Sequence, residues 1–268
     1  MSAVRVVATD GGIVAWRNLK RIPRIPELAI FAILQSIMFV LLFAYVFGGA
    51  IPLPGGGSYK EYLMPGIFIQ TLGFGSITTA IGMADDLQKG LIDRFRSLPM
   101  ARSAVLSGRT VSDLIYNACL LVVLMATGLA VGWRVNNGVS DFLAAVALML
   151  GFTLAMLWIG VLLGLLAPSV EVAQQLGFLV IFPLTFVSNA FVPIQTLPSV
   201  LQTFAEWNPT SSLANSLRHQ FGNPGGRIPH DAIFPLAHPF AYTVIWAVAI
   251  VVVCAPLSVV LYQRSIKS

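Results

Sequence analysis

The sequence of 268 residues is 57% hydrophobic, only 10% charged and carries a net charge of +5. Soluble domains contain about a quarter charged residues, so this composition excludes a soluble globular protein and predicts an all-α polytopic membrane protein. The placement of the charges, described below, attributes the excess of basic residues to membrane topology and not to nucleic-acid binding.

Long uncharged runs predict six transmembrane helices. They are expected at residues 27–47, 63–84, 110–132, 142–167, 172–191 and 240–262. Each run reaches the roughly 20 apolar residues with which a helix crosses a bilayer, and none shows the alternating polarity of a spanning strand. The third span is expected to begin at Thr110, because Thr110 and Asp113 resemble a capping box. Residues 1–268 are therefore predicted to form a single membrane domain.

The first 26 residues are expected in the cytoplasm, with an amphipathic helix lying on the membrane surface. Basic residues recur at helical spacing on one face of residues 13–24, and Trp16 lies with aliphatic residues toward the other. Basic and aromatic faces of this kind sit at the level of the lipid headgroups. Pro23 and Pro26 then end this interfacial helix and begin the first span.

The loop between the second and third spans, residues 85–109, holds eight of the 27 charged residues (16 basic plus 11 acidic). From Asp86 to Leu98, apolar residues fall on one stripe at steps of four, four and three, with most charges off it. The loop is therefore predicted to form a short amphipathic helix that Pro99 ends. Such a helix either transmits a push from a soluble partner to both spans or only anchors the loop in headgroups, and the pattern leaves both open.

Residues 192–239 are too polar for a span but contain apolar helical pieces. Pro198–Glu206 and Ser211–Phe221 each carry an apolar face, and an Asn-Pro pair separates them. Two half-length helices joined in this way predict a re-entrant or interfacial hairpin on the outer side of the membrane. The residues that mark it are Pro193, Pro198, Asn208 and Pro209.

The basic residues give the orientation. With six spans and a cytoplasmic N-terminus, 12 of the 16 Lys and Arg residues lie inside, including those of the tail at 263–268. The four outside are Lys60, Arg134, Arg218 and Arg227. This asymmetry follows the positive-inside rule and places both termini in the cytoplasm.

Several kinds of chemistry are missing from the sequence. No Walker A pattern, dinucleotide fingerprint or Cys/His cluster occurs, so no catalytic, cofactor-binding or metal-binding residue is expected in this chain. The middle of the predicted spans carries only neutral polar residues, whereas ion-driven carriers usually need a charged group there. Most of these neutral residues are expected to join helices. The candidates for lining a substrate path are Gln35, Gln70, Thr71, Asn117, Ser188 and Asn189.

Three stretches carry a resemblance to a known family. They are YLMPG at 62–66, DRFRSLPMARSAVLSGR at 93–109 and FVPIQTLPSVLQTFAEWNPTSSLANSLR at 191–218. Together they resemble the permease subunits of type-2 ABC exporters, most closely the daunorubicin-resistance-type drug permeases of actinomycetes. The layout of spans and charges agrees, so the resemblance covers nearly the whole chain.

The resemblance implies a set of partners and a coupling helix. The family's permease pairs with a second permease subunit, either an identical copy or a paralogue, and with a cytoplasmic ABC ATPase dimer that holds ATP and Mg. Its coupling helix maps onto residues 85–99, where Gly90, Asp93, Arg94, Phe95 and Pro99 match the pattern and Asp86, Leu87 and Leu91 complete the helix. Many members carry Glu-x-Gly here. This chain has Gln88-Lys89-Gly90, so a contact that needs the carboxylate would have to come from Asp86.

The expected function is ATP-driven export of hydrophobic or amphiphilic compounds, such as drugs or lipids, across the bacterial plasma membrane. The path is expected to be apolar and in contact with membrane lipids, and no nucleic acid is implied. The alternatives are an ion-coupled multidrug antiporter, and a membrane scaffold or lipid-modifying enzyme that transports nothing. A copurifying ATPase would distinguish the exporter from all of these.

Overall fold

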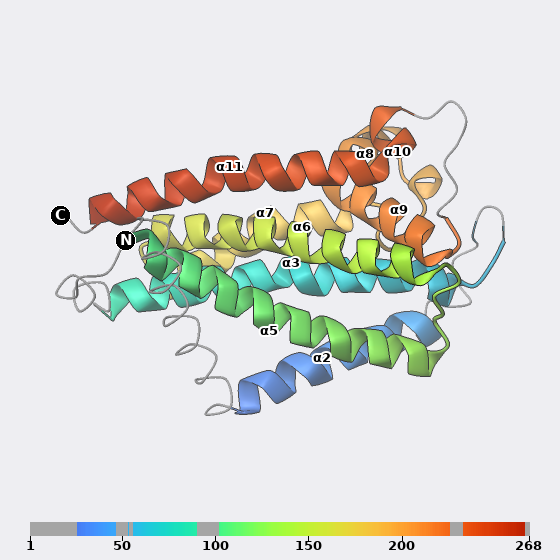
Figure 1. Ribbon diagram of the computed structural model, residues 1–268, viewed down its shortest axis with the longest axis horizontal. Helices are drawn as coiled ribbons and strands as arrows, with labels where there is room; N and C mark the ends of the chain where they lie inside the picture. The colour runs from blue at the N-terminus through green and yellow to red at the C-terminus, as the bar shows by residue number, and fades with distance from the viewer. Residues whose placement is uncertain (1–25, 47–52, 54–55, 90–101, 226–232, 266–268) are drawn as a thin grey trace.

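The computed structural model describes residues 26–46, 53, 56–89, 102–225 and 233–265, and the regular structure within them is helical. The long helices run along one axis of the molecule (Figure 1). They are α2 (Pro26–Val46), α3 (Tyr59–Gln88), α5 (Arg102–Val131), α6 (Val139–Leu166), α7 (Val170–Phe186) and α11 (Pro239–Ser265). Consecutive long helices run in opposite directions, as expected of a chain that crosses a membrane repeatedly.

Among the described residues, four helical segments are long and apolar enough to cross a membrane by length and composition: Tyr59–Gln88, Val105–Val131, Val139–Leu166 and Pro239–Gln263. Two shorter apolar stretches, Ile33–Val46 and Val170–Phe186, belong to α2 and α7. At 1.5 Å per residue, the 17 residues of α7 reach about 26 Å, slightly less than the roughly 30 Å of a hydrocarbon core. The chain is a helical multi-pass membrane protein, and the predicted number of six crossings stays a prediction.

Helix α3 lies at the centre of the bundle, and α6 packs closely along it. Gly160 and Gly164 of α6 form a small-xxx-small pair. A Cβ atom at either position would collide with the backbone oxygen of Ser76 or Ala80 in α3. Small residues of this spacing allow two helix backbones to approach closely in a membrane, where dispersion contacts replace the hydrophobic effect as the main attraction.

In contrast, α11 has the least buried apolar window of the four span-length segments in the described residues. Only 11% of its most apolar window is buried, and large side chains such as Val252 and Val253 are exposed along it. Exposed apolar side chains at this density are costly in water, but they match the lipid tails of a bilayer. The outer surface of the bundle is therefore built for lipid or for another apolar helix.

Short helices gather at the end of the bundle where α3 begins and α7 ends (Figure 1). They are η2 (Ile194–Thr196), α8 (Ser199–Trp207), α9 (Pro209–Phe221) and α10 (Phe234–Ala237). The side chain of Asn208 accepts a hydrogen bond from the Thr210 amide and caps α9, while Pro209 occupies the first turn. The expected break between two half-length helices at Asn208 and Pro209 is confirmed.

Two predicted helix boundaries beside the charged loop are wrong. Helix α5 begins at Arg102, so Thr110 lies inside it, donates its hydroxyl to the Leu106 carbonyl and is not an N-cap. Helix α3 continues to Gln88, so Asp86 and Leu87 belong to its last turn and do not begin a separate helix. In both places favourable packing extends the helix past the charged residues at which the sequence pattern predicts the end of a span.

The other observed helix ends differ less from the predicted ones. Helix α7 ends at Phe186 and not near residue 191, because the chain turns after Pro183 and uses residues 187–191 to contact α3 and α9. Residues 90–99 of the predicted coupling helix and all of the interfacial helix (residues 13–24) lie outside the described residues.

Candidate functional site: a charged end and a hairpin end

Polar contacts concentrate at the two ends of the bundle. We call one the charged end: Asp85, Asp86 and Lys89 on α3, with Arg109 and Asp113 on α5. The other is the hairpin end: residues 187–225, which comprise the turn after α7 and helices α8 and α9. The two ends lie at opposite poles of the long axis (Figure 1).

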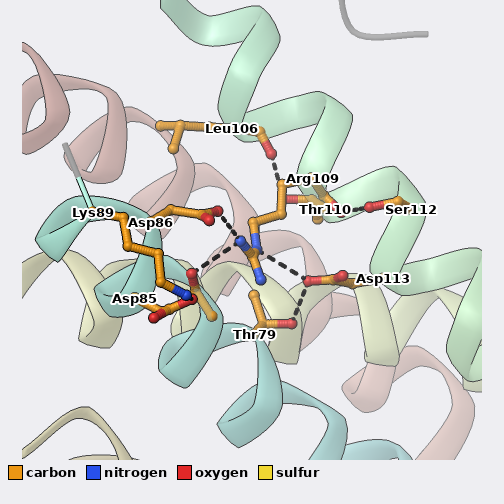
Figure 2. Close-up of polar contacts among 10 residues, drawn as sticks. Thr79, Asp85, Asp86, Lys89, Leu106, Arg109, Thr110, Ser112 and Asp113 are labelled. Carbon is orange, nitrogen blue, oxygen red and sulfur yellow. Dashed lines mark hydrogen bonds and ion pairs between the residues drawn. The ribbon is translucent and has the colours of Figure 1, made fainter. Parts of the chain in front are cut away.

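At the charged end, Arg109 bridges α3 and α5 (Figure 2). Its guanidinium donates to an Asp86 carboxylate oxygen and to the Gly82 carbonyl, the latter at 3.0 Å. Its Nε lies 3.6 Å from Asp113, and that carboxylate also accepts a hydrogen bond of 2.7 Å from the Thr79 hydroxyl. The three charged side chains are only 17–27% exposed, so water replaces these contacts poorly.

Glycines on α3 give the α5 side chains room. A Cβ at Gly82 would overlap the Arg109 guanidinium, and a Cβ at Gly75 would overlap the Asn117 amide. The stripe Gly75, Thr79, Gly82, Asp86 recurs at steps of four, three and four, which is one face of a helix. This face meets Arg109, Asp113 and Asn117 of α5, which recur every four residues.

The seam also contains charged residues in the first half of α5, whereas the middle of the spans is predicted to carry only neutral polar residues. Arg109 and Asp113 lie within the apolar segment Val105–Val131. Asp113 is eight residues beyond Val105, or about 12 Å along the helix. Because α5 begins at Arg102, both charges lie within the helix and not at its first residues.

The structure describes only some of the predicted coupling residues. Asp86 contacts Arg109, and Leu87 packs against a small core formed by Met83, Leu106, Val161 and Tyr262. Gly90, Leu91, Asp93, Arg94, Phe95 and Pro99 lie outside the described residues. The structure thus describes the two helices that flank the predicted coupling segment.

The candidate path residues do not lie together. Gln35 is exposed on α2, whereas Gln70 is buried in α3 and Thr71 is half-buried beside it. Asn117 is buried and donates to the Asp113 carbonyl at 2.8 Å. Within the described part of the chain, the Gln70 amide nitrogen and the Asn117 amide oxygen have no hydrogen-bond partner.

Ser188 and Asn189 lie instead at the hairpin end, in the turn after α7. The Ser188 hydroxyl donates to the Thr185 carbonyl and accepts from the Ala190 amide. The Asn189 amide nitrogen of the side chain donates to Asn215 of α9, and its backbone N–H donates to Ser211. These contacts place both residues in the packing of the turn, although the Asn189 side-chain oxygen has no hydrogen-bond partner among the described residues.

Arg218 of α9 is fully buried and helps to hold this turn to α3, together with Tyr62, whose hydroxyl donates to the Asn189 carbonyl. Its Nε donates to the Tyr62 carbonyl at 2.9 Å, and its Nη2 donates to the carbonyls of Asn189 and Ala190 at 2.8 and 2.9 Å. The guanidinium carbon stands 3.5 Å from the centre of the Tyr62 ring, a cation–π contact. Burial lowers the pKa of Arg218 from its ordinary value, yet a guanidinium stays charged at neutral pH.

Sequence reasoning missed the roles of Arg109 and Arg218, which it counted only as topogenic charges. A signal for Arg109 existed, because small and polar residues recur at helical spacing on both partner helices. For Arg218 the sequence offers less: it is simply a charge in a helix whose other faces are apolar or small. Among the described residues, no group of His, Cys, Asp and Glu is placed to hold a metal ion.

Comparison with known proteins identifies the family. The ABC-2 type transporter family matches residues 11–221. A daunorubicin resistance ABC transporter permease protein of Streptomyces coeruleorubidus is 29% identical over 211 residues, covering 79% of this chain and 74% of the relative. A probable doxorubicin resistance ABC transporter permease protein of Mycobacterium tuberculosis is 26% identical over 240 residues, covering 87% and 81%. A putative transport permease of Cyanophora paradoxa is 22% identical over 255 residues, covering 92% and 86%.

The match spans most of the sequence, including α3, the charged end and the hairpin end. It agrees with the helical multi-pass fold and with the resemblance noted from the sequence. The chain therefore belongs to the ABC-2 type transporter family of membrane permeases.

Proposed function

We propose that the chain is the transmembrane permease subunit of an ATP-driven exporter that moves hydrophobic or amphiphilic compounds out across the bacterial plasma membrane. The observation that carries the proposal is the charged end. There α3 leads into the charged loop, α5 leads out of it, and Arg109 joins the two helices. Relatives named for daunorubicin and doxorubicin resistance support a drug-like substrate. ATP hydrolysis, with ATP and Mg, belongs to a separate ATPase subunit.

The orientation follows from the excess of basic residues at one end. The charged end and both termini face the cytoplasm, and the hairpin end, marked by Pro193, Pro198, Asn208 and Pro209, faces outward as a re-entrant hairpin. Because α3 continues through Gln88, the contact with the ATPase dimer is made by residues 90–99, with Arg94 and Phe95 at its centre. Asp86 and Leu87 belong to the end of α3, which moves with this contact.

The path forms between this permease and a second one, identical or paralogous. Helices α2 and α7 carry exposed apolar faces, with Phe31 and Met38 on α2 and Leu179 on α7 each more than three-fifths exposed. Lipid covers the rest of the bundle. Gln35, exposed on α2, and the half-buried Thr71 supply an amide and a hydroxyl along a largely apolar route, which suits an amphiphile better than an ion or a sugar chain. Gln70 and Asn117 are buried and belong to the packing between helices.

The alternative function is an ion-coupled multidrug antiporter, and one observation favours it: Asp113 is a carboxylate within the apolar part of α5. Its contacts argue against that role. A proton-binding carboxylate must exchange with water, whereas Asp113 is engaged by Arg109 and Thr79 at the same time.

The experiment reconstitutes the complex purified through a tag on this chain and follows daunorubicin movement in vesicles. With wild type, ATP is expected to drive transport that a protonophore does not abolish. Arg94→Ala with Phe95→Ala is expected to remove transport and the substrate stimulation of ATPase activity while the complex still assembles. Transport that needs a proton gradient and no ATP, or an undiminished double variant, would overturn the proposal.

A further inference from the structure

The contacts between α3 and α5 keep one register along the seam. Arg109 meets Gly82, Asp113 meets Thr79, Asn117 meets Gly75 and Gly128 meets Met64. Steps of four, four and eleven residues toward the hairpin end on α5 are matched by steps of three, four and eleven on α3. The charged contacts at one end and the glycine contacts in the middle therefore specify the same antiparallel alignment.

This alignment resists sliding. A shift of α5 by one turn, about 5.4 Å, would carry Arg109 away from Gly82 and Asp86 together. It would also move Asn117 off Gly75, the position in this part of α3 where its amide fits. A partly buried guanidinium without its carboxylates is strongly disfavoured, so the seam has one stable register and not several.

The neighbouring seam between α3 and α7 is built differently. Gly177 of α7 lies against Ile77, and Gly73 of α3 lies against Ile181 and Thr185. These contacts involve glycine, isoleucine and threonine, and among the described residues they include no pair of opposite charges. Apolar seams of this type allow small sliding movements at lower cost than a charged one.

We propose that Arg109 is a positioning residue for energy coupling, a role that rests on the function proposed above. It fastens the two helices on either side of residues 90–99 into one lever, which moves against α7 when the ATPase displaces that segment. Without Arg109 or Asp86, movement of the segment separates α3 from α5, and ATP is hydrolysed without transport.

The test measures daunorubicin transported per ATP hydrolysed in the reconstituted complex. Asp86→Asn and Arg109→Met are expected to lower this ratio about tenfold, within the usual range of coupling between sites, with the KM for ATP unchanged. Arg109→Lys keeps a positive charge and is expected to retain most of the ratio. Asp85→Asn is the matched control, because Asp85 pairs with Lys89 on its own helix and not across the seam.

Each outcome supports or overturns the inference. An unchanged ratio in both Asp86→Asn and Arg109→Met overturns it and leaves the proposed function standing. An equal loss in Asp85→Asn also overturns it, since the charge and not the seam would then matter. A wild-type complex without ATP-driven transport overturns the proposed function and this inference with it. If Arg109→Met fails to assemble, the transport ratio of Asp86→Asn against that of Asp85→Asn still distinguishes the outcomes.

Discussion

Each end of the bundle is organised by one arginine, and the two arginines are held in opposite ways. Arg109 at the charged end is 17% exposed and pairs with carboxylates of Asp86 and Asp113. Arg218 at the hairpin end is fully buried, and its described partners are three carbonyl oxygens and the ring of Tyr62. Both link segments far apart in sequence.

The difference indicates different roles. Neutral carbonyl acceptors belong to the backbone and cannot be displaced without unfolding the turn, so Arg218 is a permanent part of the fold. The Asp86 carboxylate is carried on a side chain in the last turn of α3, so the contact with Arg109 stands beside the segment proposed to move. The contacts of Arg218 make the hairpin end rigid, and under the proposed function the charged end transfers force.

Replacing Arg218 is expected to have the largest effect on stability, and it tests the contrast between the two arginines. Arg218→Ala removes three charge-assisted hydrogen bonds and leaves a cavity, and we expect a loss of about 3 kcal/mol or more in the free energy of unfolding. For a chain of this size, that lowers Tm by about 6–12 °C. Thermal unfolding in detergent measures it. Arg134→Ala is the control, because among the described residues the Arg134 guanidinium donates only to the nearby carbonyls of Leu129 and Trp133. Equal shifts in both variants would refute the role of Arg218.

A second prediction concerns the room that glycine gives to Arg109. Gly82→Ala should raise helix propensity by about 1 kcal/mol, yet its Cβ would displace the guanidinium, and we expect a net loss of about 1–2 kcal/mol. The matched variant is Gly151→Ala in α6, where an added Cβ meets nothing within 4 Å. It is expected to be neutral or slightly stabilising. If thermal unfolding shows the same sign for both glycines, close approach of Arg109 is not important to stability.

A third prediction tests whether the hairpin end is rigid beyond Arg218. Asn223 accepts a hydrogen bond from the Trp133 indole at 2.8 Å and donates to the Arg134 carbonyl at 2.9 Å. Asn223→Ala should cost about 1 kcal/mol, or about 2–4 °C in Tm. Hydrogen exchange of residues 132–138 should rise with it. Unchanged exchange there would show that the connection between α5 and α6 is held by other contacts.

The smallest effect is expected at the exposed pair of the charged end. Lys89 is 57% exposed and pairs with Asp85 one turn earlier on α3. Surface pairs of this kind contribute about 0–1 kcal/mol, so Lys89→Ala should leave Tm nearly unchanged. A shift as large as that of Gly82→Ala would mean that the intrahelical pair, and not Arg109, stabilises this end.

The sequence predicts the apolar helices well because hydrophobic length is a property of each segment alone. It also predicts the Asn208-Pro209 break, since proline and a capping asparagine act locally. The prediction fails near Thr110 and at Asp86, where charged residues wrongly indicate the limit of a span. The charges there are satisfied by a partner on another helix, and such pairing depends on the packing register, which no single helix contains.

The seam between α3 and α5 leaves a pattern in the sequence that could have predicted it. Gly75, Thr79, Gly82 and Asp86 recur on one face of α3, and Arg109, Asp113 and Asn117 recur on one face of α5. Matching these stripes predicts the contact. No comparable pattern indicates Arg218, because its acceptors are backbone carbonyls, which every sequence has.

The central claim is that α3 and α5 move as one lever when ATP is hydrolysed. Spin labels at Gln88 and Val111, both exposed, report the distance across the seam, and labels at Gln88 and Leu179 report movement of α3 against α7. Cys119 and Cys254 are first replaced by serine. Pulsed electron resonance of the complex, diluted with unlabelled protein, is compared without nucleotide and after trapping with ATP and vanadate. We predict an unchanged distance from Gln88 to Val111 and a changed distance from Gln88 to Leu179; a change of similar size in both would contradict the lever.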